Sequence, residues 1–262
     1  MISYRKHGVA PYRIGVVHGG PGAPGSIAPV AREIAVQKGV IEPFQTKDNI
    51  PDLVEELKIC LEIHATLPVI LVGHSWGAWL SCMFASNHPS FVSKLLLIGS
   101  GPFEIRFSHR IMDIRLKRLS NQERIEVKRL TAKLKQPHTQ NQSDVFEQFA
   151  CLMYKADMYD PLPYRKESIG YNPEIFQRVW EEAKKIRENG TLIDSIAHIT
   201  CPVVALHGDF DPHPGNGVKI PLSRHIEDFR YVELKNCGHY PWMEKQAKNE
   251  FYSKLRKELY LD

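Results

Sequence analysis

The segment Gly73–Gly77 (GHSWG) constrains the fold of this chain more than any other. It fits the pattern G-x-S-x-G, in which a serine sits on a sharp turn between a strand and a helix. The apolar run Pro68–Gly73 predicts a buried strand, and Trp76–Asn87 predicts a helix. The flanking glycines let neighbouring chain approach a strained turn closely. We therefore expect Ser75 to be a nucleophile exposed at the end of a strand.

Short apolar runs alternate with helical stretches over much of the chain. This alternation predicts an α/β fold, with a mostly parallel sheet covered by helices on both faces. The other predicted strands are Arg13–Val17, Val40–Phe44, Phe91–Ile98, Pro202–Gly208 and Phe229–Leu234. A helix is expected from about Ser26 to Lys38, with Ser26 as its N-cap.

The alternation stops between residues 103 and 190, where charged helical periodicity replaces strand-like runs. We expect residues 103–190 to form a helical cap, inserted into a core made of residues 1–102 and 191–262. Residues 104–135 of the cap carry ten Arg and Lys side chains against four acids. Such a stretch either attracts an anionic substrate or surface, or forms the solvated face of a cap helix.

A glycine-rich loop, His18–Gly22 (HGGPG), follows the predicted strand Arg13–Val17. The tetrahedral intermediate of acyl transfer needs two hydrogen-bond donors at its oxyanion. We expect the backbone N–H of Trp76 to be one donor and this loop to supply the other. Gly20 is assigned that role, because without a side chain it lets substrate lie against the backbone. The alternatives are a turn that only reverses the chain and a phosphate-binding loop, but the spacing and lysine of the latter are missing.

The acid and the base are expected after the cap, in the chain order serine, acid, histidine. Asp209 and Asp211 both follow the predicted strand that ends at Gly208. We favour Asp211, because a loop of this length can turn its carboxylate back over the sheet edge. Asp209 is expected to accept local backbone N–H groups in an Asx-type turn. His239, after the last strand, is predicted to be the general base, with Asp211 fixing its tautomer.

Other histidines compete with this assignment. His207 lies at a strand end, His225 lies in a predicted helix, and His213 lies in the same loop as Asp211. His18 and His74 flank the glycine-rich loop and the nucleophile. We interpret these two as scaffold residues that bond backbone groups, and not as a second base.

Composition argues against several classes of function. A net charge of +4 on 262 residues is weak evidence for a nucleic-acid partner. No apolar run is long enough to span a membrane. The five cysteines are scattered without a C-x-x-C pair, which is typical of a reducing, cytoplasmic protein. We expect a small-molecule or short-peptide substrate, no cofactor and no metal.

Four segments together, HGGPG, GHSWGAW, HGDFDPHP and GHYPWME, resemble the α/β-hydrolase superfamily. HGGPG with tryptophan directly after the serine is most similar to the branch of proline iminopeptidases and related aminopeptidases. The resemblance implies hydrolysis of a small ester or amide through an acyl-serine intermediate. In that branch, cap carboxylates hold the amino group of the substrate. The cap acids that we considered are Glu104, Asp144, Glu147, Asp157 and Glu174, and no motif assigns that role to any of them.

Two other functions stay open beside an aminopeptidase. One is a carboxylesterase-like hydrolase, and the other is a non-catalytic ligand-binding protein on the same fold. The segment before HGGPG is also short for this superfamily, so we expect the usual first strand or strands to be missing.

Overall fold

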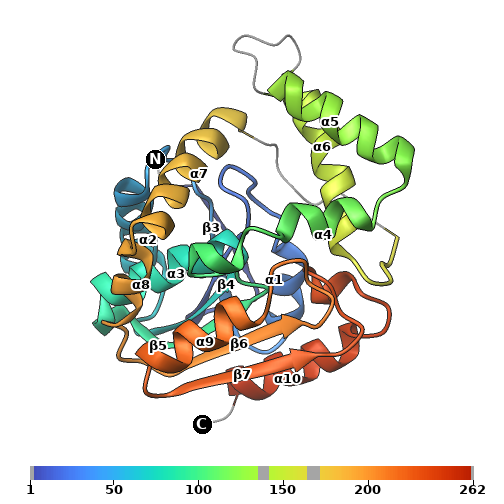
Figure 1. The fold of residues 1–262 in the computed structure, drawn as a ribbon. Helices are drawn as coiled ribbons and strands as arrows, with labels where there is room; N and C mark the ends of the chain where they lie inside the picture. The colour runs from blue at the N-terminus through green and yellow to red at the C-terminus, as the bar shows by residue number, and fades with distance from the viewer. Residues whose placement is uncertain (1–2, 135–141, 164–171, 261–262) are drawn as a thin grey trace.

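A seven-stranded sheet in the order β1-β3-β2-β4-β5-β6-β7 organises the chain (Figure 1). The structure is a computed structural model that describes residues 3–134, 142–163 and 172–260. Its strands are β1 (Tyr4–His7), β2 (Tyr12–Val17), β3 (Gly39–Pro43), β4 (Val69–His74), β5 (Val92–Ile98), β6 (Val203–Gly208) and β7 (Phe229–Leu234). The strands from β3 to β7 in this order pair in parallel, which confirms the predicted mostly parallel sheet.

Strand β1 is the antiparallel exception, and it corrects the expectation that the segment before HGGPG holds only the strand at Arg13–Val17. It pairs with β3 at the edge of the sheet, with Tyr4 opposite Pro43 and His7 opposite Val40. Its sequence, YRKH, is polar and its residues are mostly half-buried or exposed. Charged side chains are typical of edge strands, because they hinder pairing with another chain.

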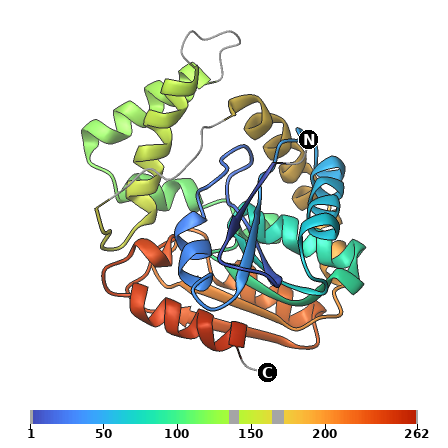
Figure 2. The same ribbon diagram turned by 180° about the vertical axis from the view of Figure 1, so that it is seen from behind.

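Helices cover both faces of the sheet, as predicted (Figure 1, Figure 2). The helices of the core are α1 (Ala28–Ile34), α2 (Ile50–His64), α3 (Trp76–Asn87), α8 (Thr191–Ile196), α9 (Asn216–His225) and α10 (Lys248–Tyr260). One buried cluster joins α2, α3, α8 and α9 to the sheet, and another joins α1 and α10 to the opposite face. The predicted helix N-cap at Ser26 is wrong. Helix α1 begins at Ala28 and no side chain caps its N-terminus. Ser26 Oγ is buried with no hydrogen-bond partner among the described residues.

The middle of the chain is helical and stands partly apart from the sheet (Figure 1). It contains α4 (Ile111–Lys117), α5 (Asn121–Leu134), α6 (Gln142–Asp157) and α7 (Pro173–Glu188). Helices α5 and α6 share a small cluster of their own around Val127 and Met153. In contrast, α7 packs Val179 and Ala183 into the main cluster over the sheet. The boundaries predicted for core and cap stay a prediction.

None of the helices within the described ranges is both long and apolar enough to cross a membrane.

Candidate active site

Ser75 occupies the turn between β4 and α3 in a strained conformation. Its φ is 54° and its ψ is −117°, and residues other than glycine rarely adopt a positive φ of this kind. The two flanking positions, 73 and 77, have room only for glycine, because a Cβ there would clash with backbone atoms. A Cβ on Gly73 would lie 2.4 Å from the carbonyl oxygen of Gly77, and one on Gly77 would lie 2.3 Å from that of Val17. The turn therefore places Ser75 at the N-terminus of α3, where the helix dipole favours negative charge.

The predicted base and acid lie beside this serine. His239 Nε2 is 3.0 Å from Ser75 Oγ, and His239 Nδ1 is 2.7 Å from Asp211 Oδ2. Since an ionised carboxylate can only accept, Nδ1 carries the proton and Nε2 is free to accept the serine proton. The structure thus brings Ser75, His239 and Asp211 into one hydrogen-bonded line, starting from three different strand ends.

Asp209, the alternative acid, forms no hydrogen bond with His239 within the described chain. Its carboxylate accepts the backbone N–H of Cys237 at 3.3 Å, so it joins the loops that follow β6 and β7. The Asx-type turn expected at Asp209 is formed by Asp211 instead, because Asp211 Oδ1 accepts the N–H of His213 at 2.9 Å.

Asp211 is buried among histidines. Burial alone raises the pKa of a carboxyl group, but the nearby rings of His239, His213 and His207 hold the pKa of Asp211 well below its usual range. The side chain of Asp211 has no exposed surface, so these polar neighbours replace water around its charge. Asp211 is therefore an anion that can orient His239 without taking up its proton.

Two histidines that compete in the sequence surround this carboxylate. His213 Nδ1 donates to Asp211 Oδ1 at 2.7 Å, and His207 Nε2 donates to the carbonyl oxygen of His213 at 2.8 Å. Among the described residues, neither of these two histidines forms a hydrogen bond with Ser75, and His225 is exposed on α9. Sequence reasoning did not find the contact of His213 with Asp211, although the spacing of two residues in Asp211-Pro-His213 is that of an Asx turn.

His74 and His18 bond backbone groups, as the sequence analysis expected. His74 Nε2 donates to the carbonyl oxygen of His239 at 3.0 Å. This bond links β4 to the loop after β7 that carries the predicted base, His239, which we call the loop of the base. The N–H of Gln45 donates to His18 Nε2 at 3.2 Å, and His18 Nδ1 donates to the carbonyl oxygen of Gly19. Burial lowers the pKa of both histidines, so both rings are neutral around pH 7.

The glycine-rich loop lies against the serine. A Cβ on Gly19 would come within 3.1 Å of Ser75 Cβ, and Gly20 has a φ of 58°, where glycine is favoured. Gln45 ties this loop to the residue after the serine. Its side chain accepts from Trp76 Nε1 at 2.7 Å and donates to the carbonyl oxygen of His18 at 3.0 Å. The roles of Gly20 and Trp76 as oxyanion donors stay predictions, and Gln45 is a supporting residue that the sequence reasoning missed.

Two arginines of the basic stretch bind protein groups, and one of them, Arg118, reaches the acid loop. Arg115 binds Asp157 with two hydrogen bonds of 2.6 and 2.7 Å. Arg118 donates to the carbonyl oxygens of Ala156 and Phe210, and its guanidinium lies 3.6 Å from the centre of the Phe210 ring. These arginines are therefore engaged in contacts with protein groups and do not line a solvated face. Arg129 is exposed and pairs with Glu126, and Lys135 lies outside the described residues.

The segment after α6 also holds the loop of the base. The carbonyl oxygen of Asp157 accepts the N–H of His239 at 2.9 Å. The buried carboxylate of Glu244 accepts the N–H groups of Gly238, Tyr159 and Asp160 at 2.7, 2.8 and 2.8 Å. Glu244 thus joins the cap segment to the residue before His239, and sequence reasoning did not single it out.

Two of the five cap acids considered in the sequence are already paired with arginines. Asp157, which is 2% exposed, already neutralises Arg115, and Glu104 accepts from Arg106 at 3.0 Å. The remaining three cap acids considered in the sequence are exposed: Asp144, Glu147 and Glu174.

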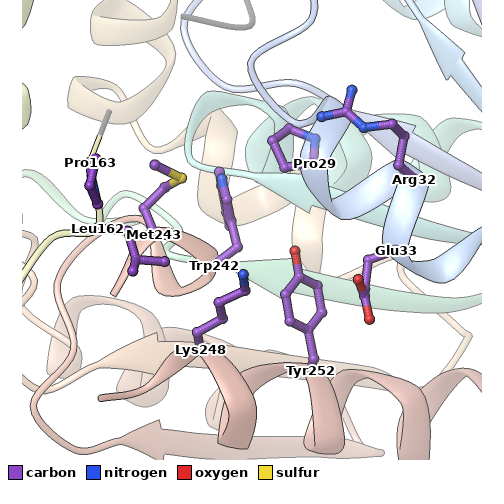
Figure 3. Close-up of a pocket in the computed structure, with 9 residues that line it drawn as sticks. All are labelled: Pro29, Arg32, Glu33, Leu162, Pro163, Trp242, Met243, Lys248 and Tyr252. Carbon is purple, nitrogen blue, oxygen red and sulfur yellow. The ribbon is translucent and has the colours of Figure 1, made fainter. Parts of the chain in front are cut away.

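A cavity of about 410 Å³ lies between α1, α10 and the loop after β7 (Figure 3). Trp242, Met243 and Leu162 form its apolar side, and Tyr252 points into it from α10. Ser75, Asp211 and His239 do not line it. It therefore lies beside the loop of the base and is separate from the hydrogen-bonded line.

One group of side chains in the described chain has donor atoms spaced for a metal ion. The ligand atoms of Asp211, His213 and His239 lie within 4.8 Å of one another. Both Nδ1 atoms direct protons at Asp211, so a metal ion would have to displace these protons. The expectation that the protein uses no metal stays a prediction.

Comparisons with known proteins agree with this architecture. Several solved structures are similar over nearly the whole chain. A carboxylesterase of the thaumarchaeon Nitrososphaera gargenis has a TM-score of 0.65 at 18% identity, covering 98% of this chain and 93% of its own. A proline iminopeptidase of Mycobacterium smegmatis has a TM-score of 0.62 at 19% identity, with the same coverage of 98% and 93%. A bromoperoxidase of Bacillus anthracis has a TM-score of 0.63 at 14% identity, with coverage of 97% and 94%.

At these identities the likeness establishes a shared fold and not a shared activity. A search of curated proteins found no match. The family model described as alpha/beta hydrolase fold matches residues 16–246, which is most of the chain. This chain therefore belongs to the α/β-hydrolase fold family.

Proposed function

We propose that this protein is a serine hydrolase that cleaves a small ester or amide through an acyl-Ser75 intermediate. The observation that carries the proposal is the hydrogen-bonded line from Ser75 Oγ through His239 to Asp211, with distances of 3.0 and 2.7 Å. This line begins at a strained serine at a helix N-terminus, in a chain of the α/β-hydrolase family. A binding protein without turnover does not require that combination.

In the first step, Ser75 Oγ attacks the carbonyl carbon of the substrate while His239 Nε2 takes the serine proton. Asp211 keeps the proton on His239 Nδ1 and stabilises the imidazolium that forms. The negative charge moves onto the carbonyl oxygen, where we assign the N–H groups of Trp76 and Gly20 as donors. A single donor of this kind contributes about 3 kcal/mol to transition-state stabilisation.

In the second step, His239 protonates the leaving alcohol or amine, and the bond between the carbonyl carbon and the leaving group breaks. A water molecule then attacks the acyl-serine, with His239 again taking a proton. Ser75 is released with its hydroxyl proton restored and the acid is the product. No step requires a cofactor, so the proposal names none.

The cap contacts favour an ester over an aminoacyl amide as the substrate. An aminopeptidase must hold the free amino group of its substrate, and an unpaired carboxylate near the serine serves that purpose. Asp157 is bound by Arg115, and Glu104 is bound by Arg106. Each of these two acids is already neutralised by an arginine, which weakens its attraction for an ammonium group. An aminopeptidase is the second candidate, supported by the HGGPG and GHSWG motifs.

Rates on two substrates test the proposal. Purified protein is assayed on a short-chain aryl ester and on a prolyl arylamide, with Ser75→Ala as the control for each. We expect the ester to be cleaved by the wild type and not by Ser75→Ala. Cleavage of the amide that depends on Ser75 would support the aminopeptidase instead. Equal rates for wild type and Ser75→Ala on both substrates would refute the proposal.

A further inference from the structure

We propose that His213 is a positioning residue for this hydrolysis, which holds the carboxylate of Asp211 in the orientation that His239 requires. The inference rests on the proposed function, since it concerns how the acid of that site is fixed. His213 forms no hydrogen bond with Ser75 within the described chain, and its ring bonds to the site through Asp211.

The two oxygens of Asp211 are divided between two histidine rings. Oδ2 accepts from His239 Nδ1, and Oδ1 accepts from His213 Nδ1, both at 2.7 Å. The backbone N–H of His213 adds a second bond to Oδ1 at 2.9 Å. Because a carboxylate can rotate about its last torsion, bonds to one oxygen fix the direction of the other. The His213 ring, together with the backbone N–H of the same residue, therefore sets where Oδ2 points.

The loop around His213 is itself fixed. Pro212 and Pro214 flank it, so the backbone is stiff on both sides. His207, at the end of β6, donates from Nε2 to the carbonyl oxygen of His213 at 2.8 Å. The support thus runs from the sheet through His207 and His213 to Asp211, and from there to His239 and Ser75.

The His213 ring also lies against the base. Its centre is 4.5 Å from that of His239, with 38° between the ring planes. Other charged or titratable groups near this ring are Asp211 in its own loop, His207 on β6, His74 on β4, and Arg115 of the cap with its partner Asp157. Burial lowers the pKa of His213 to about 4, so the ring is neutral near pH 7 and donates one Nδ1 proton without adding charge beside His239.

Loss of the ring donor should lower turnover and leave substrate binding unchanged. The His213→Leu variant keeps bulk and the backbone N–H but removes the bond from the ring. His213→Asn places an amide N–H near the position of Nδ1, so it can restore the bond. A small misplacement of catalytic groups can cost up to about 100-fold in rate. We expect kcat of His213→Leu to fall about 10- to 100-fold, with KM changed less than about threefold.

The test measures kcat and KM on the aryl ester for wild type, Ser75→Ala, His213→Leu and His213→Asn. His225→Leu, at an exposed histidine of α9, is the matched control. The low-field proton NMR signal of the bond between His239 and Asp211 is recorded for each folded variant. We expect this signal to weaken or shift in His213→Leu, and His213→Asn to regain both the signal and kcat within about threefold.

The outcomes separate the two proposals. If the wild type shows turnover that depends on Ser75 and His213→Leu stays within about twofold of it, the role of His213 is refuted and the hydrolase is retained. If His213→Asn is as slow as His213→Leu, or if His213→Leu changes only KM, the role is also refuted. If the wild type has no turnover that depends on Ser75, the proposed function fails and this inference fails with it. Should His213→Leu not fold, the comparison of His213→Asn with wild type in rate and NMR signal decides.

Discussion

Removal of the Glu244 carboxylate should loosen the junction between the cap and the loop of the base. Glu244 has no exposed surface and accepts three backbone N–H groups. In Glu244→Ala these donors lose their acceptor. The N–H of Gly238 is buried, and leaving it unpaired costs about 2–3 kcal/mol. The N–H groups of Tyr159 and Asp160 are partly reached by water, so each costs about 1 kcal/mol.

The sum is a loss of about 4–5 kcal/mol in the free energy of unfolding. For a protein of this size, that corresponds to a fall in Tm of about 8–20 °C. Glu244→Gln should cost much less. The amide oxygen of the glutamine can keep the hydrogen bonds to the N–H groups of Gly238 and Tyr159. Only the N–H of Asp160 then faces an amide nitrogen and loses its acceptor, which lowers the free energy of unfolding by about 1 kcal/mol.

Urea unfolding and thermal melting followed by circular dichroism measure these losses. Glu250→Ala is the matched control, because Glu250 is exposed on α10 and forms one i,i+4 ion pair with Lys254 at 3.3 Å. Such a pair contributes at most about 0.5 kcal/mol. If Glu244→Ala and Glu250→Ala lose the same stability, or if Glu244→Gln is as damaged as Glu244→Ala, the reasoning from the three bonds is wrong.

Three further predictions concern pH, metal and salt. The folded protein should lose stability as the pH falls from about 6.5 to about 4, because burial lowers the pKa of His213 to about 4 and the unfolded chain takes up this proton first. This proton uptake changes the free energy of unfolding by about 3 kcal/mol. The free energy of unfolding in urea should differ less between pH 7 and pH 4.5 in His213→Asn than in the wild type. An equal difference in the two proteins would contradict the assignment to His213. Dialysis against EDTA should leave ester hydrolysis unchanged, and a loss restored by zinc would overturn the metal-free mechanism. KM for an anionic ester should vary less than about twofold between low and high salt, because Arg115 and Arg118 are engaged by protein groups; a steep rise of KM with salt would show that the basic stretch attracts substrate.

The candidate site could be predicted because its residues follow strand ends. In a parallel sheet those ends meet at one edge, and the register places Gly73 of β4 opposite Leu97 of β5 and Gly208 of β6 opposite Leu234 of β7. A motif after each strand therefore predicts both the identity and the approximate position of a side chain. Loop length favoured Asp211 over Asp209, and in the structure it is the Asp211 carboxylate that faces His239.

The features that escaped prediction depend on contacts between distant segments. Gln45 joins Trp76 to His18, and Glu244 joins Gly238 to the segment after α6. Neither Gln45 nor Glu244 belongs to a periodic sequence pattern or a motif that would predict its contacts. Strand β1 was missed because a polar edge strand has no apolar alternation. The helix N-cap at Ser26 was predicted from residue type alone, whereas α1 begins two residues later, at Ala28.

Covalent labelling shows whether Ser75 is an activated nucleophile. The protein is incubated with a fluorophosphonate at pH 7.5, digested, and analysed by peptide mass spectrometry; His239→Ala and heat-unfolded protein serve as controls. We expect the probe to modify Ser75 in the folded wild type, and His239→Ala and the unfolded chain to react far more slowly. A folded wild type in which Ser75 stays unmodified, or in which His239→Ala is labelled as fast, would contradict the proposal that His239 activates Ser75 for hydrolysis.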